Sequence, residues 1–371
     1  MNIHRKNLWE MDDWPNFTWQ ISALKPKLDQ IRLLQGKLIG KLDDLPATFE
    51  HQAQVDILVE NVMRNRGVEN QRFDLEDFIS SATGFSSYSS QSDKELSREP
   101  ISSLLTLWIN VVQKHQGEVA LDDLIAWHRA LFADVAPAKV NQILAINNKA
   151  FSPEASTLDE VHIEAPPRAN NRLELLGFLR WFNLQSNGVD GLIRAGITHL
   201  WLVILQPFDV GNKRISRVLT DLALAQAEPQ SIKYYSMSSA ININQSFYEQ
   251  AREKMLSGSL DVTAWLCDFL TLLEESIQLG IARINHFMRK THYWQKHSQT
   301  VLNARQLKLL NDLLDAKESE GEDEASIYAS KYMDITQVSK ATATRELTDL
   351  LQKHCIRKLP GGGRSTRYVI A

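Results

Sequence analysis

The sequence predicts a mainly α-helical protein with a small β-containing module at its C-terminal end. Apolar residues recur at helical spacing through most of the 371 residues. The apolar–polar alternation that is typical of strands is confined to short pieces such as residues 161–163 and 368–370. With 43% apolar residues, 23% charged residues and a formal net charge of −4, the composition is that of an ordinary globular protein. It does not indicate a nucleic-acid-binding or membrane protein as a whole.

Apolar periodicity predicts a series of amphipathic helices that polar segments separate. The first helix starts near Ala23, and the second covers residues 46–62. A serine-rich stretch at residues 80–100 predicts a loop or linker. Further helices are expected at residues 101–115, 121–132, 171–185, 191–205, 215–227, 243–256 and 262–284. An acidic run at residues 318–324 predicts a solvated connector before the C-terminal module.

The C-terminal module has the pattern of a winged helix. A short helix near residues 335–339 and a second helix at 342–353 precede two strand pieces, at 356–359 and 366–370. A Pro-Gly-Gly-Gly turn lies between these pieces, so they are expected to form a β-hairpin wing. Residues 331–371 contain eight Lys or Arg and three acidic residues. DNA backbone contacts are therefore one expected use of the module, and protein interaction is the other.

A turn near the middle of the chain carries the pattern from which chemistry is expected. Gly211 and Asn212 tolerate strained backbone, and they lead directly into a helix whose first N–H groups lack intrahelical partners. Arg214 and Arg217 lie three residues apart on one helical face, which makes an anion site suited to a polyphosphate. Asp209 adds an oxygen ligand of the kind that Mg²⁺ prefers. The plain alternative is a capped helix start with two solvated arginines.

This turn resembles the signature of Fic-domain proteins, which is written HxFx(D/E)GNGRxxR. The similar run is Gln206-Pro207-Phe208-Asp209-Val210-Gly211-Asn212-Lys213-Arg214-Ile215-Ser216-Arg217. Members of that family typically move AMP from ATP onto a protein hydroxyl. The resemblance therefore implies ATP and Mg²⁺ as cofactors and Asp209 as the metal ligand. It also implies nucleotide contacts from Phe208, Gly211, Asn212, Lys213, Arg214 and Arg217.

Two positions of the turn depart from the signature. Gln206 stands at the catalytic position of the family's general base, a His, and glutamine cannot accept a proton near neutral pH. Losing a positioned base typically lowers the rate by about 10²–10⁴-fold, while ligand binding can survive. Lys213 replaces the second Gly, which resembles a branch of the family that transfers a phosphoryl group. His199, two helical turns upstream, is expected to pack in the core instead of replacing the base.

Other segments extend the resemblance to one Fic subfamily. The box Asp13-Trp14-Pro15-Asn16-Phe17 and the Gly-Gly-Gly-Arg-Ser-Thr run at residues 361–366 resemble its two ends. The aromatic residues of the box are also expected to serve as a packing anchor. Residues 161–167 resemble the end of a β-hairpin flap that docks a target strand, but residues 141–159 lack the usual pattern of that flap.

A short motif points to inhibition within the chain. Residues 65–70 resemble the inhibitory helix of many Fic proteins, whose pattern is (S/T)xxxE(G/N). The resemblance implies that Glu69 pairs with Arg217 and keeps this arginine off the γ-phosphate. Because the motif is short, a solvated helical glutamate is the alternative.

The resemblance implies a mainly α fold with a Fic-type helical core, a helical N-terminal segment, a small β-hairpin flap and a C-terminal winged helix. The expected domains are an N-terminal helical domain with the inhibitory helix (1–95), the Fic core (96–285), connector helices with an acidic linker (286–325) and the winged helix (326–371).

The changed turn favours a protein that keeps an ATP- and Mg²⁺-binding pocket but has lost or weakened AMP transfer. Two alternatives stay open: an active nucleotidyl or phosphoryl transferase with an atypical loop, and a DNA-binding regulator that uses the Fic core as a sensor. The expected partner is a target protein or a paralogue, and DNA and a second copy of the chain are further candidates. The sequence has no signal-peptide pattern and no run of about 18 apolar residues, so we expect a cytoplasmic protein without a membrane partner.

Overall fold

The computed structural model describes residues 7–43, 107, 111, 117–132, 171–184, 188–208, 211–228, 234–256, 259–315, 326–360 and 366–371. Helices predominate in these ranges, and their strands form one two-stranded sheet, so the mainly α prediction is confirmed. The chain divides into two units, residues 1–283 and 284–371. The boundary lies within the long helix α12 (Thr263–Lys296). The finer division into four domains stays a prediction.

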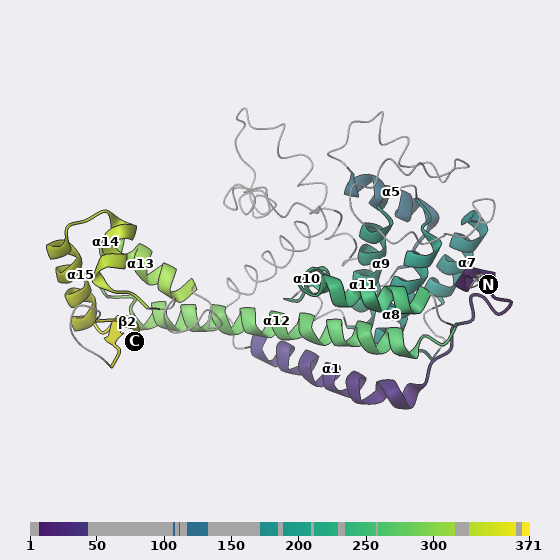
Figure 1. Ribbon diagram of the computed structural model, residues 1–371, viewed down its shortest axis with the longest axis horizontal. Helices are drawn as coiled ribbons and strands as arrows, with labels where there is room; N and C mark the ends of the chain where they lie inside the picture. Colours follow the sequence, from purple (N-terminus) through teal and green to yellow (C-terminus); the bar gives the residue numbers. More distant parts are fainter. Residues whose placement is uncertain are drawn as a thin grey trace, which may run out of the picture. The chain divides into compact units, whose positions relative to one another are not determined.

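Two buried helices form the centre of the first unit. α8 (Gly191–Leu205) is mostly apolar, and every residue after Gly191 is buried. A helix of this composition is stable only when neighbours cover it all round. α9 (Asn212–Ala227) packs against it, and α7 (Asn171–Asn183) and α5 (Leu121–Leu131) pack against α8 and α9 respectively. Figure 1 shows these four helices gathered in one part of the molecule. The turn that carries the signature therefore connects the two central helices.

The N-terminal aromatic box anchors the start of the chain to this centre. The rings of Trp14 and Phe17 meet Trp201 of α8 edge-on, with centroid separations of 6.0 and 5.6 Å. The indole N–H of Trp14 donates a hydrogen bond to Glu174 of α7 at 3.1 Å. The box thus has the packing role expected for it. α1 (Ile21–Leu42) follows and lies along α12 (Figure 1).

The segment after α9 contains one helix more than the sequence predicts. The helix expected at residues 243–256 is present as α11 (Gln245–Leu256), but a short helix that was not predicted, α10 (Met237–Ile243), precedes it. Ser236 caps the start of α10 by accepting a hydrogen bond from the N–H of Ser239 at 3.1 Å. At its end, the Asn244 side chain donates to the carbonyl of Ala240, which satisfies a terminal backbone group and marks the break.

The second unit has the order of a winged helix. α13 (Ala304–Asp315) is followed by an extended residue, Ile327, and then by α14 (Ala329–Thr336) and α15 (Lys340–Gln352). The hairpin of β1 (Ile356–Lys358) and β2 (Tyr368–Ile370) closes the unit, with Ile356 opposite Ile370. Ile327 exchanges two backbone hydrogen bonds of 2.8 Å with Tyr368 and so joins the sheet edge.

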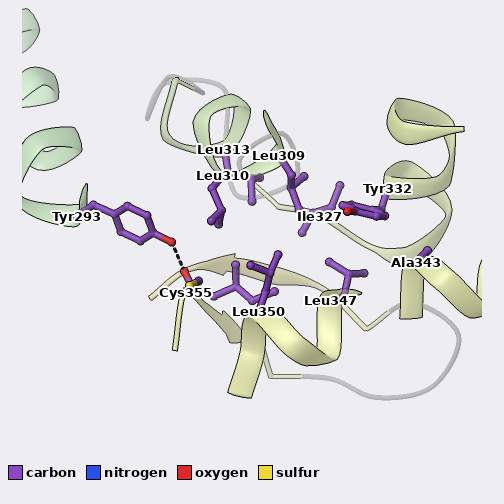
Figure 2. Close-up of a cluster of buried hydrophobic side chains, with 11 residues drawn as sticks. Tyr293, Leu309, Leu310, Leu313, Ile327, Tyr332, Ala343, Leu347, Leu350 and Cys355 are labelled. Carbon is purple, nitrogen blue, oxygen red and sulfur yellow. Dashed lines mark hydrogen bonds between the residues drawn. The ribbon is translucent and has the colours of Figure 1, made fainter. Parts of the chain in front are cut away.

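A single hydrophobic cluster holds the second unit together. Figure 2 shows leucines of α13 facing Leu347 and Leu350 of α15, with Ile327 between the helices. The hydroxyl of Tyr293, near the end of α12, donates to the carbonyl of Cys355 at 2.9 Å (Figure 2). This contact explains why α12 continues beyond the predicted end at residue 284, because its last turns supply side chains to this core.

Several expected features lie outside the described residues. They are the helix at 46–62, the inhibitory motif at 65–70, the flap at 140–167, the acidic run at 318–324 and the glycine turn of the wing. Within the described ranges, no helix combines the length and apolar character that crossing a bilayer requires.

Candidate functional site at the start of α9

The site is built on the turn between the two central helices. α8 ends at Leu205 and is followed by the cap residue Gln206, whose backbone is left-handed with φ 43° and ψ 60°. α9 begins after Gly211, which is also left-handed, with φ 79°. The Asn212 side chain accepts a hydrogen bond from the N–H of Phe208 at 2.9 Å and donates one to its carbonyl at 2.7 Å. The first residue of α9 thereby fixes the path of the turn.

The turn packs against the end of α5. The Phe208 ring is 4% exposed and stacks on His128, with ring centroids 4.0 Å apart and an interplanar angle of 15°. A Cβ atom on Gly211 would lie 2.5 Å from the ring of Phe132. Together with the positive φ, this close approach explains why the position needs glycine.

The cations of the first two turns of α9 meet different neighbours. Arg214 donates to the carbonyl of Leu131 at 3.3 Å, and its guanidinium lies 5.0 Å from the ring centroid of Phe132 at the end of α5. Arg217 donates to the side-chain oxygen of Asn242 on α10 at 3.1 Å. Helical spacing thus places both arginines near one helix end, and each is steadied by a different helix.

The remaining cation of the turn faces α11. The ammonium of Lys213 lies 3.6 Å from a carboxylate oxygen of Glu249, and the other oxygen of Glu249 pairs with Arg252. Lys213 is a half-exposed side chain, whereas Arg252 is buried. The start of α9 is therefore surrounded by more cationic than anionic side chains, which favours binding of an anion.

Buried groups beneath these cations have displaced pKa values. Burial raises the pKa of the Asp221 carboxyl to about 8, although the charge of Arg217 acts in the opposite direction. Burial also lowers the pKa of Arg217. At neutral pH a protonated Asp221 leaves the charge of Arg217 largely uncompensated by this neighbour, which further favours an anion at the site.

His199 is a satisfied core residue, as the sequence predicts. It is 1% exposed, and its two ring nitrogens lie 2.9 Å from Thr220 Oγ1 and from the hydroxyl of Tyr248. Burial and the charges of Arg217 and Arg252 lower its pKa to about 3, so it is neutral. His199 therefore contributes no charge or accessible base to the site.

Comparison with known proteins relates the region around this site to a family model. Residues 118–224 match the model of the Fic/DOC family. The chain contains a Fic/DOC family domain. Residues 7–83 match a model described as a domain of unknown function (DUF4172). Residues 322–371 match the transcriptional regulator DIP2311-like, C-terminal domain, a region that includes the winged helix seen in the structure.

Individual relatives of the Fic domain are distant. Proteins named protein adenylyltransferase fic-1 from Caenorhabditis briggsae and Caenorhabditis elegans are each 26% identical over 121 residues. This alignment spans 32% of the chain and only 22% of each relative. A crystal structure of a Fic family protein from Desulfovibrio desulfuricans G20 aligns with a TM-score of 0.50 and 14% identity, covering 94% of this chain and 96% of that one. This likeness shows the fold alone.

The structure describes most, but not all, of the predicted site. Gln206 and the predicted nucleotide contacts other than the metal ligand are brought to the ends of α8 and α9. Asp209 and Glu69 lie outside the described residues, so the Mg²⁺ ligand and the inhibitory pair stay predictions. In the described part of the Fic domain and elsewhere in those ranges, no three His, Cys, Asp or Glu side chains form a metal-binding group.

Three residues at this site were not predicted from the sequence. Asn242 and Glu249 each contact a cation of α9 from a helix beyond the signature. No local sequence pattern predicts such long-range pairs. Asp221 lies one helical turn after Arg217, and this i, i+4 spacing of opposite charges could have drawn attention to it.

Proposed function

We propose that the chain is a Fic-domain protein that binds ATP through the start of α9 and transfers AMP weakly or not at all. The observation that carries the second half of this proposal is the burial of the histidines around Gln206. His128 is fully buried under Phe208, and His199 is 1% exposed with both ring nitrogens bonded. Near the signature turn, the described residues thus offer no accessible imidazole as a general base.

The first half of the proposal rests on the chemistry of the turn. The N–H groups that open a helix attract phosphate oxygens, and α9 opens directly at the turn that Asn212 holds. The guanidiniums of Arg214 and Arg217 are anchored at their outer ends by α5 and α10, so little ordering is needed before they contact a ligand. These features fit a polyphosphate in its charge and in its need for several donors.

The remaining parts of the function follow from the family. We propose that Asp209 contributes an oxygen to a Mg²⁺ ion that neutralises phosphate charge, as hard cations bound to nucleotides do. The target would be a hydroxyl of another protein. A chain that binds ATP without efficient transfer would act as a regulator or as the partner of an active paralogue.

Binding of ATP in the presence of Mg²⁺ tests the proposal. Isothermal titration calorimetry of the full chain with ATP should give a measurable Kd. Arg217→Gln should raise this Kd at least about tenfold, because it removes a charge-assisted contact. Arg180→Gln, an exposed change on α7 in the same unit, is the matched control and should leave the Kd unchanged. Absence of ATP binding at millimolar concentration in the folded wild type would refute the proposal.

A second candidate function is DNA binding by the winged helix. The outer face of α15 carries four exposed residues, which are Lys340, Thr344, Arg345 and Thr348. The two acidic residues of α15 are engaged, since Glu346 is buried and Asp349 pairs with Lys353. Exposed cations continue onto the hairpin at Arg357, Lys358 and Arg367. A cationic helix beside a cationic hairpin suits contacts to a phosphate backbone.

Charge reversal distinguishes this candidate from a protein-interaction role. The full chain should bind duplex DNA at low salt, and the double change Lys340→Glu with Arg345→Glu should reduce affinity by at least about tenfold. Lys308→Glu, an exposed change on α13, should have a small effect. DNA that is not shifted at about 50 mM salt would count against the candidate.

A further inference from the structure

Glu249 introduces a negative charge into the cation cluster of the proposed nucleotide site. It lies on α11, and its carboxylate pairs with Lys213 at 3.6 Å and with Arg252 in the same helix. Of the three side chains, Lys213 is the most exposed, at 42%, and Glu249 is 28% exposed. The pair is therefore accessible to a ligand, whereas Arg252 holds Glu249 from the buried side.

A chain of buried hydrogen bonds fixes α11 against the first turns of α9. Thr220 donates to the carbonyl of Ser216 at 2.6 Å, so its oxygen is left to accept from His199 Nδ1–H. His199 Nε2 then accepts a hydrogen bond from the Tyr248 hydroxyl. The Ser216 hydroxyl donates to the carbonyl of Lys213 at 2.9 Å. The backbone of Lys213 is thus linked to the residue that precedes Glu249.

This chain of hydrogen bonds distinguishes the Lys213–Glu249 pair from a chance contact of two surface side chains. Exposed ion pairs usually contribute little, because both side chains must be ordered to form them. Here Arg252 orders the carboxylate, and the hydrogen bonds through Tyr248 and His199 fix the two backbones relative to each other. The carboxylate is therefore held in place beside Lys213 before any ligand arrives.

We propose that Glu249 is an intramolecular competitor of the phosphates, which holds the Lys213 ammonium against α11 and lowers the affinity of the site for nucleotide. The inference rests on the proposed ATP site. Binding of a polyphosphate would separate the pair, and Lys213 would exchange one anionic partner for another. The exchange leaves Glu249 with Arg252 as its remaining partner. Lys213 therefore adds little to the affinity of the wild type for the ligand, although it lies in the signature turn.

Titration of ATP into variants of the full chain tests this inference. Glu249→Gln should lower the Kd for ATP about threefold to tenfold, since removing a nearby like charge favours the anion by roughly the value of an exposed ion pair. The ratio of the wild-type Kd to the variant Kd should be the same for inorganic tripolyphosphate. For adenosine, which has no phosphates, the substitution should leave the Kd unchanged. Glu253→Gln, the same change on the exposed face of α11, is the matched control and should leave the Kd unchanged.

Glu249→Ala, which removes the same charge, keeps the test decisive if Glu249→Gln is poorly folded. Lys213→Met in the Glu249→Gln background should remove the gain, so that the double variant binds ATP no more tightly than Lys213→Met alone. A gain from Glu249→Gln that persists at full size in the Lys213→Met background would overturn the inference. So would a folded Glu249→Gln variant that binds ATP no better than the wild type. If the wild type binds neither ATP nor tripolyphosphate, the proposed function fails and the inference fails with it.

Discussion

The side chain of Asn212 is hydrogen-bonded in both directions to the backbone of Phe208, at 2.9 and 2.7 Å. We predict that Asn212→Ala lowers the free energy of unfolding by about 1–3 kcal/mol, because two partly buried backbone groups lose their partner. Asn212→Asp keeps the acceptor and loses the donor, so its effect should be smaller. Urea denaturation measures both. An alanine variant as stable as the wild type would show that the turn does not depend on this side chain.

The contacts around Asn212 also show how far sequence reasoning reaches. The pattern of Gly211 and Asn212 before an apolar-periodic helix predicts a turn and a helix start, and both are present. The bounds of α8 match the prediction for residues 191–205, because a mostly apolar run ends at a turn. The hairpin of the winged helix is predicted as well, since strand pieces and turn residues are neighbours in sequence.

Features that depend on distant residues escape the same reasoning. The spacing of Arg214 and Arg217 indicates a shared face, but it says nothing about the carbonyl of Leu131 or the side chain of Asn242 that receive their hydrogen bonds. The Glu249 partner of Lys213 lies on another helix, beyond the signature. Such pairs are set by how helices pack, and a single sequence does not encode that packing as a local pattern.

Asp221 should make the stability of the protein fall as the pH rises. Its pKa in the folded chain is raised to about 8 from a usual value of 3.8, so the folded state binds a proton that the unfolded state has released. The stability that this proton contributes is fully present below about pH 4 and is lost as the pH rises through about 8. The Asp221→Asn variant has no carboxyl at this position, so its stability should not fall with pH for this reason.

Denaturation of the wild type and Asp221→Asn at several pH values measures the difference. The free energy of unfolding of the variant minus that of the wild type should increase between about pH 5 and pH 9. A difference that stays constant over this interval would mean that the carboxyl of Asp221 does not titrate differently in the folded and unfolded chains.

Glu346 should have the opposite dependence on pH in the second unit. Its side chain accepts hydrogen bonds from Arg305, from Asn303 at 3.1 Å and from the Tyr332 hydroxyl at 2.5 Å. These contacts, first among them the hydrogen bond from Arg305, hold its pKa below the usual 4.5. Its contribution to stability is therefore present above about pH 4.5 and is lost as the pH falls through the lower folded-state value.

We predict that Glu346→Gln destabilises the protein by about 1–3 kcal/mol at pH 7, because a buried network loses its acceptor charge. The difference in the free energy of unfolding between variant and wild type should narrow as the pH falls below about 4.5 and through the lower folded-state pKa of Glu346. Asp312→Asn, an exposed change on α13, is the control and should show no comparable gap. A gap that does not depend on pH would indicate that the network is held by shape and not by the charge of Glu346.

Transfer of label from ATP shows whether the glutamine at position 206 is what limits AMP transfer. Wild type and Gln206→His would be incubated with Mg²⁺ and ATP carrying ³²P at either the α or the γ position, and labelled protein would be measured. We predict α-label on protein with Gln206→His, alone or combined with Lys213→Gly, at a rate at least about 10²-fold above the wild type, because the variant regains a positioned base. Equal labelling by the wild type would contradict the proposed loss of AMP transfer. The position of the transferred label would then distinguish AMP transfer from phosphorylation.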